Sequence, residues 1–242
     1  MKSAGNDIVA LQCINKQRTN NFRFYSKILS VSEQALYYQL RFAEMPFEKF
    51  VWLLWSIKES VYKYQKRIVP GLVFSPAKII IQGIDPPCPH IATSFGSRQW
   101  ENNNNESCEE LYKGVIIFGA DIFYSRSKIH DELISTVVSN DENFENTWWG
   151  IKSIDHTAHE NQSKAVREFI LQRLNSILPG GHDDFHIEKN PLGCPVVIMG
   201  AMEMNIPVSL AHHDNFIAYS LLLEHPLLQP DNKVSSTAFC AS

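Results

Sequence analysis

The sequence predicts an α+β protein whose strands pair mainly antiparallel. Stretches with strand character come before and after the helical stretches, without the regular strand–helix alternation that builds a parallel sheet. The chain has neither a G-x-G-x-x-G nor a G-x-x-x-x-G-K-[ST] segment, which are the phosphate-binding loops of nucleotide-binding α/β folds. Any chemistry on phosphates must therefore use another arrangement of residues.

The first third of the chain is predicted to hold one strand and two helices. Ser30 or Ser32 suits the N-cap of the first helix, because its side chain can accept a hydrogen bond from the first turn. Pro46 starts the second helix, and Pro70 and Gly71 end it. The expected elements are a strand at residues 5–11, a helix at 32–40 and a longer helix from Phe47 to about Arg67.

The remaining two thirds are predicted to be richer in strands. Apolar, β-branched runs indicate strands, and one run of helix formers that ends at Pro-Gly-Gly indicates a third helix. The last two strands flank a turn at residues 212–215. The expected strands are 78–82, 114–118, 133–138, 207–211 and 216–221, the third helix is 163–178, and exposed loops are expected at 86–89 and 101–106.

Charge is divided unevenly along the chain. The 242 residues hold 22 Lys and Arg against 26 Asp and Glu, a net charge of −4. Residues 1–73 hold 11 basic and 5 acidic residues, a net charge of +6, whereas the rest of the chain carries −10. This asymmetry indicates an anionic partner for the first third.

Composition excludes several classes of protein. The apolar runs are shorter than the ~20 residues that a membrane span needs. Residues 1–7 lack the apolar core of a signal peptide. The five cysteines form no C-x-x-C pair, so we expect neither a disulfide framework nor a structural zinc site. We therefore expect a cytoplasmic protein that binds neither a membrane nor a nucleic acid.

The segment with the most chemical information lies in the longer helix. Trp55, Glu59 and Lys63 are four residues apart, so they lie along one helix face. That face is otherwise apolar, and a carboxylate at its margin needs a partner such as a metal ion or a lysine. The alternative is an ordinary surface pair between Glu59 and Lys63, which stabilises a helix by about 0.3–0.5 kcal/mol.

Two polar residues have a place in or next to predicted strands: Asp7 lies inside the first one, and His212 follows the end of the strand at 207–211. Strands disfavour aspartate, so Asp7 is either a functional carboxylate or a turn residue at the strand edge. His212 is either a phosphate ligand or a polar turn residue. Two histidine pairs have spacings that a metal could use, but neither has a third ligand in register, and we expect other roles for them. These pairs are His156 with His159 and His182 with His186.

Five segments follow one another in an order typical of a known family. They are GNDIV at 5–9, NFRFYSKILSVSE at 21–33, WSIKESVYK at 55–63, PLGCP at 191–195 and VSLAH at 208–212. Together they resemble the 4'-phosphopantetheinyl transferase superfamily, with the segment order of the holo-acyl-carrier-protein synthases. The most specific of them is the third, which is similar to the family's W-[ST]-x-K-E-[AS]-x-x-K. The resemblance covers roughly residues 1–73 and 163–224.

The resemblance implies a fold and a division of the chain. We expect a 4'-phosphopantetheinyl transferase-like fold in which a mainly antiparallel sheet packs on a long helix. Residues 1–225 would form a single domain with a β-rich insertion at about 75–156, and residues 226–242 a flexible tail. Compact relatives with this segment order form trimers with the site between subunits, so we expect either a homotrimer or a monomer that the insertion makes possible.

The resemblance also implies an activity. The family transfers the 4'-phosphopantetheine arm of coenzyme A to a serine of an acyl or peptidyl carrier protein, with Mg²⁺, and releases adenosine 3',5'-bisphosphate. The carrier would belong to fatty acid, polyketide or peptide biosynthesis. Two alternatives stay open: a non-catalytic homologue that binds coenzyme A or a carrier protein, and a different metal-dependent phosphoester or nucleotide hydrolase.

Matching positions imply roles for individual residues near the metal. Asp7 and Glu59 would bind Mg²⁺, and Lys63 would face the same phosphates as a point charge. Glu59 or a metal-bound water would be the general base toward the serine. Lys58 matches the family lysine beside Glu59, but it lies about 100° away around the helix, so it contacts a different phosphate or pairs structurally.

The remaining matches concern the two substrates. His212 and Ser209 would contact coenzyme A, and Arg23 and Lys27 would bind the acidic carrier protein. Two positions depart from the family. Ala10 stands where many members have an acid, and Ala211 stands where they often have a second serine, so a metal-site contact and a phosphate contact are in doubt.

Overall fold

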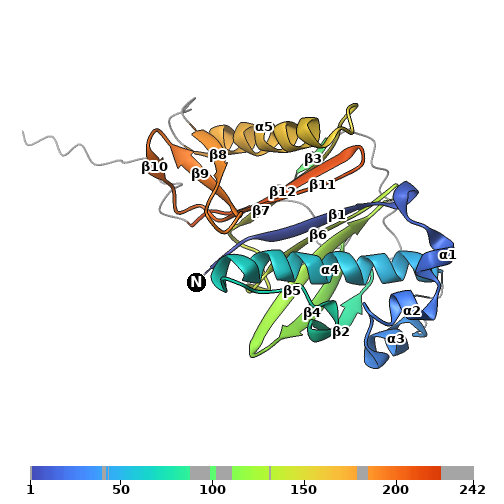
Figure 1. The fold of residues 1–242 in the computed structure, drawn as a ribbon. Helices are drawn as coiled ribbons and strands as arrows, with labels where there is room; N and C mark the ends of the chain where they lie inside the picture. The colour runs from blue at the N-terminus through green and yellow to red at the C-terminus, as the bar shows by residue number, and fades with distance from the viewer. Residues whose placement is uncertain are drawn as a thin grey trace, which may run out of the picture.

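Four layers make up the described part of the chain (Figure 1). The structure is a computed structural model, and it describes residues 2–39, 42, 44–87, 99–101, 111–130, 132–178 and 185–224. One long helix, α4, lies on the outer face of one sheet, and another, α5, lies on the outer face of a second sheet. The two sheets meet at strand β1, which contacts β11 and β12.

The helices largely follow the sequence prediction. The helix expected at 47–67 is present as α4, and the third helix begins four residues earlier than predicted. The first predicted helix is capped by Ser30, whose Oγ accepts a hydrogen bond from the Glu33 backbone. The helices are α1 (Lys16–Thr19), α2 (Phe22–Tyr25), α3 (Val31–Tyr37), α4 (Phe47–Ile68) and α5 (His159–Ile177), with 3-10 turns η1 (Leu11–Cys13) and η3 (Pro76–Lys78).

The strands of the described residues form three sheets, and all the pairings among them are antiparallel. The predicted α+β class with antiparallel pairing is therefore confirmed. The five-stranded sheet has the order β1 (Gly5–Ala10), β6 (Leu133–Ser139), β5 (Asp121–Ile129), β4 (Tyr112–Phe118) and β2 (Ile80–Asp85). The four-stranded sheet has the order β11 (Val208–His213), β12 (Phe216–Leu222), β7 (Thr147–Ser153) and β3 (Gln99–Glu101). The three-stranded sheet has the order β10 (Met202–Glu203), β9 (Pro195–Met199) and β8 (Phe185–Lys189).

The segment expected to be an insertion contributes to both larger sheets. Strand β6 pairs with β1, and strand β7 pairs with β12, so residues 75–156 complete the two sheets instead of forming an appendage. The predicted tail at 226–242 lies outside the described residues, as do most of the loops predicted between β2 and β4. Among the helices that are described, none is long and apolar enough to cross a membrane.

Two predicted turn residues are strand residues instead. Asp7 lies inside β1, opposite Thr136 of β6, so the turn alternative for Asp7 is wrong. His212 lies inside β11, opposite Ile217, so the turn alternative for His212 is wrong as well. The connection needs only two residues, because Asp214 adopts a positive φ of 53° that suits a tight hairpin.

Strand β1 separates two apolar regions. Val9 packs in the cluster around α4, whereas Ile8 and Ala10 pack with residues of β11 and β12. Because strand side chains alternate between faces, Gly5 and Asp7 share the α4 side with Val9. A Cβ at Gly5 would lie 2.2 Å from the carbonyl oxygen of Ser60, so glycine allows the close approach of strand and helix.

Candidate functional site

A lysine and two carboxylates meet between β1 and α4. The Lys63 Nζ lies 2.9 Å from Asp7 Oδ1 and 3.6 Å from Glu59 Oε1. The three side chains are largely buried, with exposed fractions of 26% for Lys63, 8% for Asp7 and 29% for Glu59. The structure thus brings Asp7 and Lys63 together across 56 residues. The alternative of an isolated surface pair is wrong, because the Glu59–Lys63 pair is one side of a partly buried triad.

The triad perturbs its own acid–base properties. Burial raises the pKa of the Glu59 carboxyl, the charge of Asp7 raises it further, and hydrogen bonds from Lys63 and Trp55 oppose the rise. Burial lowers the pKa of the Lys63 ammonium, but Asp7 and Glu59 outweigh that effect and hold it above its ordinary value. One ammonium between two carboxylates leaves the site short of positive charge.

Asp7 has an oxygen that the protein leaves unsatisfied. Asp7 Oδ2 is buried and has no hydrogen-bond partner among the described residues. An unpaired buried carboxylate oxygen is costly, and Mg²⁺ takes carboxylate oxygens as ligands. Asp7 and Glu59 could therefore hold Mg²⁺, which needs only one or two carboxylates and completes its shell with water or phosphate oxygens. Within the described ranges, no group of three or more His, Cys, Asp or Glu side chains suits a metal.

His212 lies on β11, the strand that packs beside the Asp7 strand β1 in the same chain. Its ring stacks edge to face on His159, the first residue of α5, with 5.0 Å between ring centroids. Burial lowers the pKa of His212, and nearby positive charges lower it further. Those charges belong to His159, Lys63, His213 and Lys189. Sequence spacing suggested no link between His159 and His212, because 53 residues separate them and only the packing of α5 on β11 joins them.

Side chains of β11 cap the free edge of β1. Ser209 Oγ accepts a hydrogen bond of 3.2 Å from the Asn6 backbone N–H, and His213 Nδ1 accepts one of 3.3 Å from the Ala10 N–H. These bonds tie the strand that bears Asp7 to the strand that bears His212. One chain can therefore supply the predicted metal and coenzyme residues other than Lys58, namely Asp7, Glu59, Lys63, Ser209 and His212.

The two departures from the family pattern face away from the carboxylates. Ala10 is fully buried and packs in one cluster with Ala211, which is also buried. Ala10 points to the opposite side of β1 from Asp7, so an acid at this position would not lie beside the Asp7 carboxylate. The structure therefore gives no sign that Ala10 weakens the triad.

A pocket of about 230 Å³ opens beside Lys63. Three basic side chains line it, and no acidic one does so among the described residues. Arg67 donates hydrogen bonds to the carbonyl oxygens of Pro195 and Val208, which fastens the end of α4 to β9 and β11. The polar and basic lining residues are Lys63, Lys66, Arg67, Cys194 and Ser209.

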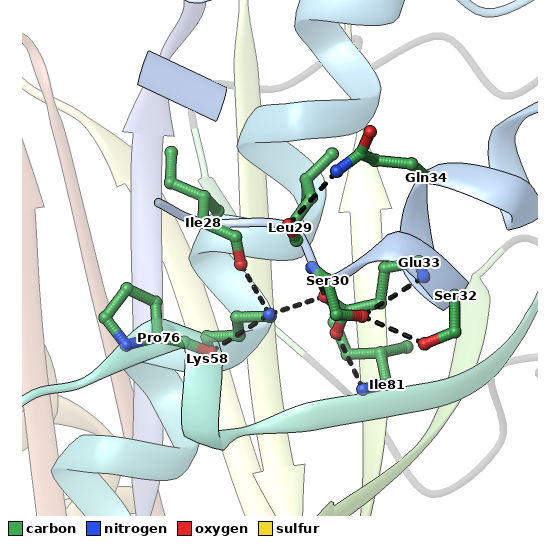
Figure 2. Close-up of polar contacts among 9 residues, drawn as sticks. All are labelled: Ile28, Leu29, Ser30, Ser32, Glu33, Gln34, Lys58, Pro76 and Ile81. Atoms are coloured by element: carbon green, nitrogen blue, oxygen red, sulfur yellow. Dashed lines mark hydrogen bonds and ion pairs between the residues drawn. The ribbon is translucent and has the colours of Figure 1, made fainter. Parts of the chain in front are cut away.

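The structure corrects the prediction that Lys58 binds coenzyme A. Its side chain is fully buried, and its Nζ donates to Ile28 O at 2.6 Å, Glu33 Oε2 at 2.8 Å and Pro76 O at 3.0 Å (Figure 2). An ammonium has three N–H donors and all three are used, so Lys58 has none left for a phosphate of coenzyme A. Of the two predicted roles, the structural pairing is the one the geometry supports.

Glu33 is the residue whose role sequence reasoning missed. The motif at 21–33 includes it, but the prediction gave it no function. The signal was the S-x-x-E spacing from Ser30 to Glu33, which forms a capping box at the start of α3. The complete burial of the Glu33 carboxylate could not be inferred from that spacing.

Helix α2, which holds Arg23 and is followed by Lys27, lies near the start of α4, away from the pocket at the other end of that helix (Figure 1). Both side chains are exposed, and Phe22 beside them is 63% exposed. The helix that holds Arg23 is only one turn long, and Lys27 follows its end. The structure thus confirms that both positions are accessible, and their binding to a carrier protein stays a prediction.

The other histidines and the cysteines form no further site among the residues described. His186 lies 3.0 Å from Glu188 in an exposed pair, and His182 falls outside the described residues. Cys13 and Cys194 are free thiols. The remaining cysteines, Cys88, Cys108 and Cys240, lie outside the described residues.

The site defines a class of protein before any comparison. Paired carboxylates, a bridging lysine and a basic pocket suit a protein that handles a divalent cation and a phosphate ester. Residues 3–113 match the family model of the 4'-phosphopantetheinyl transferase superfamily, which confirms the resemblance for this part of the chain. The superfamily is one of transferases. No curated protein and no solved structure matches the chain.

The match includes Asp7, Glu59 and Lys63 but ends before the second half of the site. The similarity of residues 191–195 and 208–212 to family segments therefore stays a prediction. The match also extends from residue 75 to residue 113, through part of the predicted insertion.

Proposed function

We propose that this protein is a Mg²⁺-dependent holo-acyl-carrier-protein synthase or related enzyme, which moves the 4'-phosphopantetheine arm of coenzyme A to a serine of an acyl or peptidyl carrier protein. Adenosine 3',5'-bisphosphate would be the other product. The observation that carries the proposal is the Asp7–Lys63–Glu59 triad, which opens through Lys63 into a basic pocket. We also propose that residues 1–225 act as a single cytoplasmic domain.

The basic pocket supports binding of coenzyme A. Lys63 and Lys66 line it from α4, and Ser209 lines it from β11. Coenzyme A carries several phosphate charges, which basic side chains in a partly buried pocket attract. His212 would contribute an imidazole beside the same phosphates. Because these residues belong to one chain, we favour a monomer over the trimer that the sequence left open.

The two carboxylates beside Lys63 could hold a metal ion. Asp7 and Glu59 would hold Mg²⁺, which when bound would neutralise negative charge on the pyrophosphate oxygens. The Lys63 ammonium, which now donates to Asp7, would provide a second positive charge to phosphate oxygens in the pocket. The protein's contribution to phosphoryl transfer is then mainly positioning and neutralisation of charge.

Glu59 is suited to accept the serine proton. Its raised pKa makes it a stronger base than an ordinary glutamate, and the Lys63 ammonium partly opposes that rise. The serine oxygen would form a bond to the β-phosphorus as the bond to the leaving phosphate oxygen breaks. The proton would pass to Glu59, and the leaving group would depart as the bisphosphate.

The carrier protein would approach the exposed basic segment. Carrier proteins are typically acidic, and Arg23 and Lys27 are exposed cations that could steer and orient them. The net charge of +6 in residues 1–73 is consistent with two anionic substrates, the carrier and coenzyme A.

The test is incubation with coenzyme A, Mg²⁺ and an apo carrier protein, with the product measured by intact mass. Asp7→Asn and Glu59→Gln should each lower the transfer rate by about 100-fold or more. Glu168→Gln, in an exposed pair on α5, is the matched control and should transfer at the wild-type rate. The proposal fails if several carriers, including the host's own, gain no arm. Coenzyme A binding without transfer would favour the non-catalytic alternative.

A further inference from the structure

A second charged cluster lies on the other side of α4, away from the triad. Figure 2 shows the Glu33 carboxylate and the Lys58 ammonium among residues of 28–34, of α4 and of 76–81. Glu33 Oε2 accepts hydrogen bonds from Lys58 Nζ at 2.8 Å and from the Ser30 N–H at 2.7 Å. Glu33 Oε1 accepts one from the Ile81 N–H at 2.8 Å. Both side chains are fully buried.

Stability alone is a weak reason for such a pair. Removing two charges from water costs several kcal/mol per ion, and well-packed apolar side chains often serve as well or better. What the pair does provide is a specific geometry, because a buried charge tolerates only an arrangement that satisfies all of its hydrogen bonds. The Glu33–Lys58 pair therefore fixes the relative positions of the segments that it joins.

Those segments include both parts of the proposed transfer machinery. The Lys58 ammonium binds the carbonyl oxygen of Ile28, which directly follows Lys27 in the exposed basic segment. Lys58 also directly precedes Glu59, about 100° around the same helical turn. One buried ammonium thus links the basic segment on one side of α4 to the carboxylate on the other.

We propose that the Glu33–Lys58 ion pair is a positioning device, which holds the Arg23–Lys27 segment at a set distance from Glu59 so that a docked carrier presents its serine to the site. The inference rests on the proposed function. It assigns no contact with substrate to either residue. It predicts that loss of the pair weakens the interaction with the carrier protein and leaves the binding of coenzyme A unchanged.

The test separates the two substrates with a charge-neutral double variant. Glu33→Gln combined with Lys58→Met removes both charges and keeps similar volumes, so no unpaired charge is buried. We expect the apparent KM for the carrier to rise about tenfold, because a displaced basic segment can no longer contact the carrier while the carrier's serine is in the site. The Kd for coenzyme A, measured without carrier, and kcat at saturating carrier should stay within about threefold of wild type.

A milder variant keeps the inference testable if the double variant does not fold. Ser30→Ala removes the hydroxyl that caps α3 at Glu33, so it loosens the segment that carries Glu33 without burying an unpaired charge. It should raise the KM for the carrier by about twofold to fivefold. The matched control is Lys164→Met with Glu168→Gln, an exposed pair on α5, which should change neither constant.

The inference is overturned if the folded double variant has a wild-type KM for the carrier, or if its coenzyme A Kd rises as much as that KM. It is also overturned if the double variant is unfolded and Ser30→Ala has a wild-type KM. A failure of the proposed function would give a distinguishable result, because the wild-type protein itself would then transfer no 4'-phosphopantetheine arm to any carrier.

Discussion

Helix α4 carries a lysine–carboxylate pair on each of two faces, and the two pairs have almost the same length. Lys58 Nζ lies 2.8 Å from Glu33, and Lys63 Nζ lies 2.9 Å from Asp7. Their surroundings differ. The first pair is fully buried, whereas 26% of the Lys63 side chain is exposed and lines a pocket.

The difference lies in how completely the hydrogen bonds are satisfied. Both oxygens of Glu33 and all three donors of Lys58 have partners in the protein. Asp7 Oδ2 has none among the described residues, and Glu59 stands as a second carboxylate beside the same lysine. A closed pair holds a fold together, and an incomplete one leaves room for a ligand. Distance alone does not distinguish them.

The largest effect should come from removing each lysine in turn. Lys58→Met leaves the Glu33 charge buried and unpaired, so we expect a loss of about 3–5 kcal/mol in the free energy of unfolding. Lys63→Met should cost about 1–3 kcal/mol, because its site is partly open to water. Urea denaturation with and without Mg²⁺ measures both.

Magnesium should affect the stability of the two lysine variants differently. It should restore part of the stability of Lys63→Met, because Asp7 and Glu59 stay available to the cation, but none of the stability of Lys58→Met. Lys63→Met should also transfer about 100-fold more slowly. Equal losses of stability that Mg²⁺ leaves unchanged would show that the two pairs are equivalent.

A smaller effect should follow from changing the strand beside the open pair. Gly5→Ala would place a Cβ 2.2 Å from the Ser60 carbonyl oxygen, so α4 and β1 must move apart. We expect a loss of about 1–3 kcal/mol and slower transfer, because Asp7 moves away from Lys63. Gly83→Ala in β2 is the matched control, since its Cβ meets no atom within 4 Å. Equal stability of the two variants would contradict the argument.

The smallest effect should be the dependence of stability on pH. The folded protein raises the pKa of Glu59, so it binds the proton more tightly than the unfolded chain does. This stabilisation is full below the unfolded pKa and is lost as pH rises through the folded pKa. In metal-free buffer, the stability of wild type relative to Glu59→Gln should therefore fall as pH rises through that range. Thermal denaturation of both proteins across acidic pH tests this, and a difference independent of pH would contradict it.

The fold was predictable as far as local patterns reach. The apolar face and the Pro46 and Pro70 punctuation defined α4 to within a residue, because helix ends depend on nearby residues. The pairing of β6 with β1 and of β7 with β12 was not predictable, since each joins strands more than a hundred residues apart or across a long helix. The segment thought to be inserted is for that reason part of both sheets.

The candidate site, like the fold, was predictable only where local sequence patterns determine it. Sequence spacing by itself determined that Glu59 and Lys63 share a helix face, because the helical repeat places residues four apart side by side. It also determined the resemblance that selects Asp7, which the family match supports. Only the tertiary structure decided that Asp7 pairs with Lys63 and that Lys58 pairs with Glu33. It also decided that β11, which bears His212, lies beside β1, which bears Asp7, in one chain. Those contacts depend on how strands and helices pack, and nothing in a local pattern specifies which buried charge will find which partner.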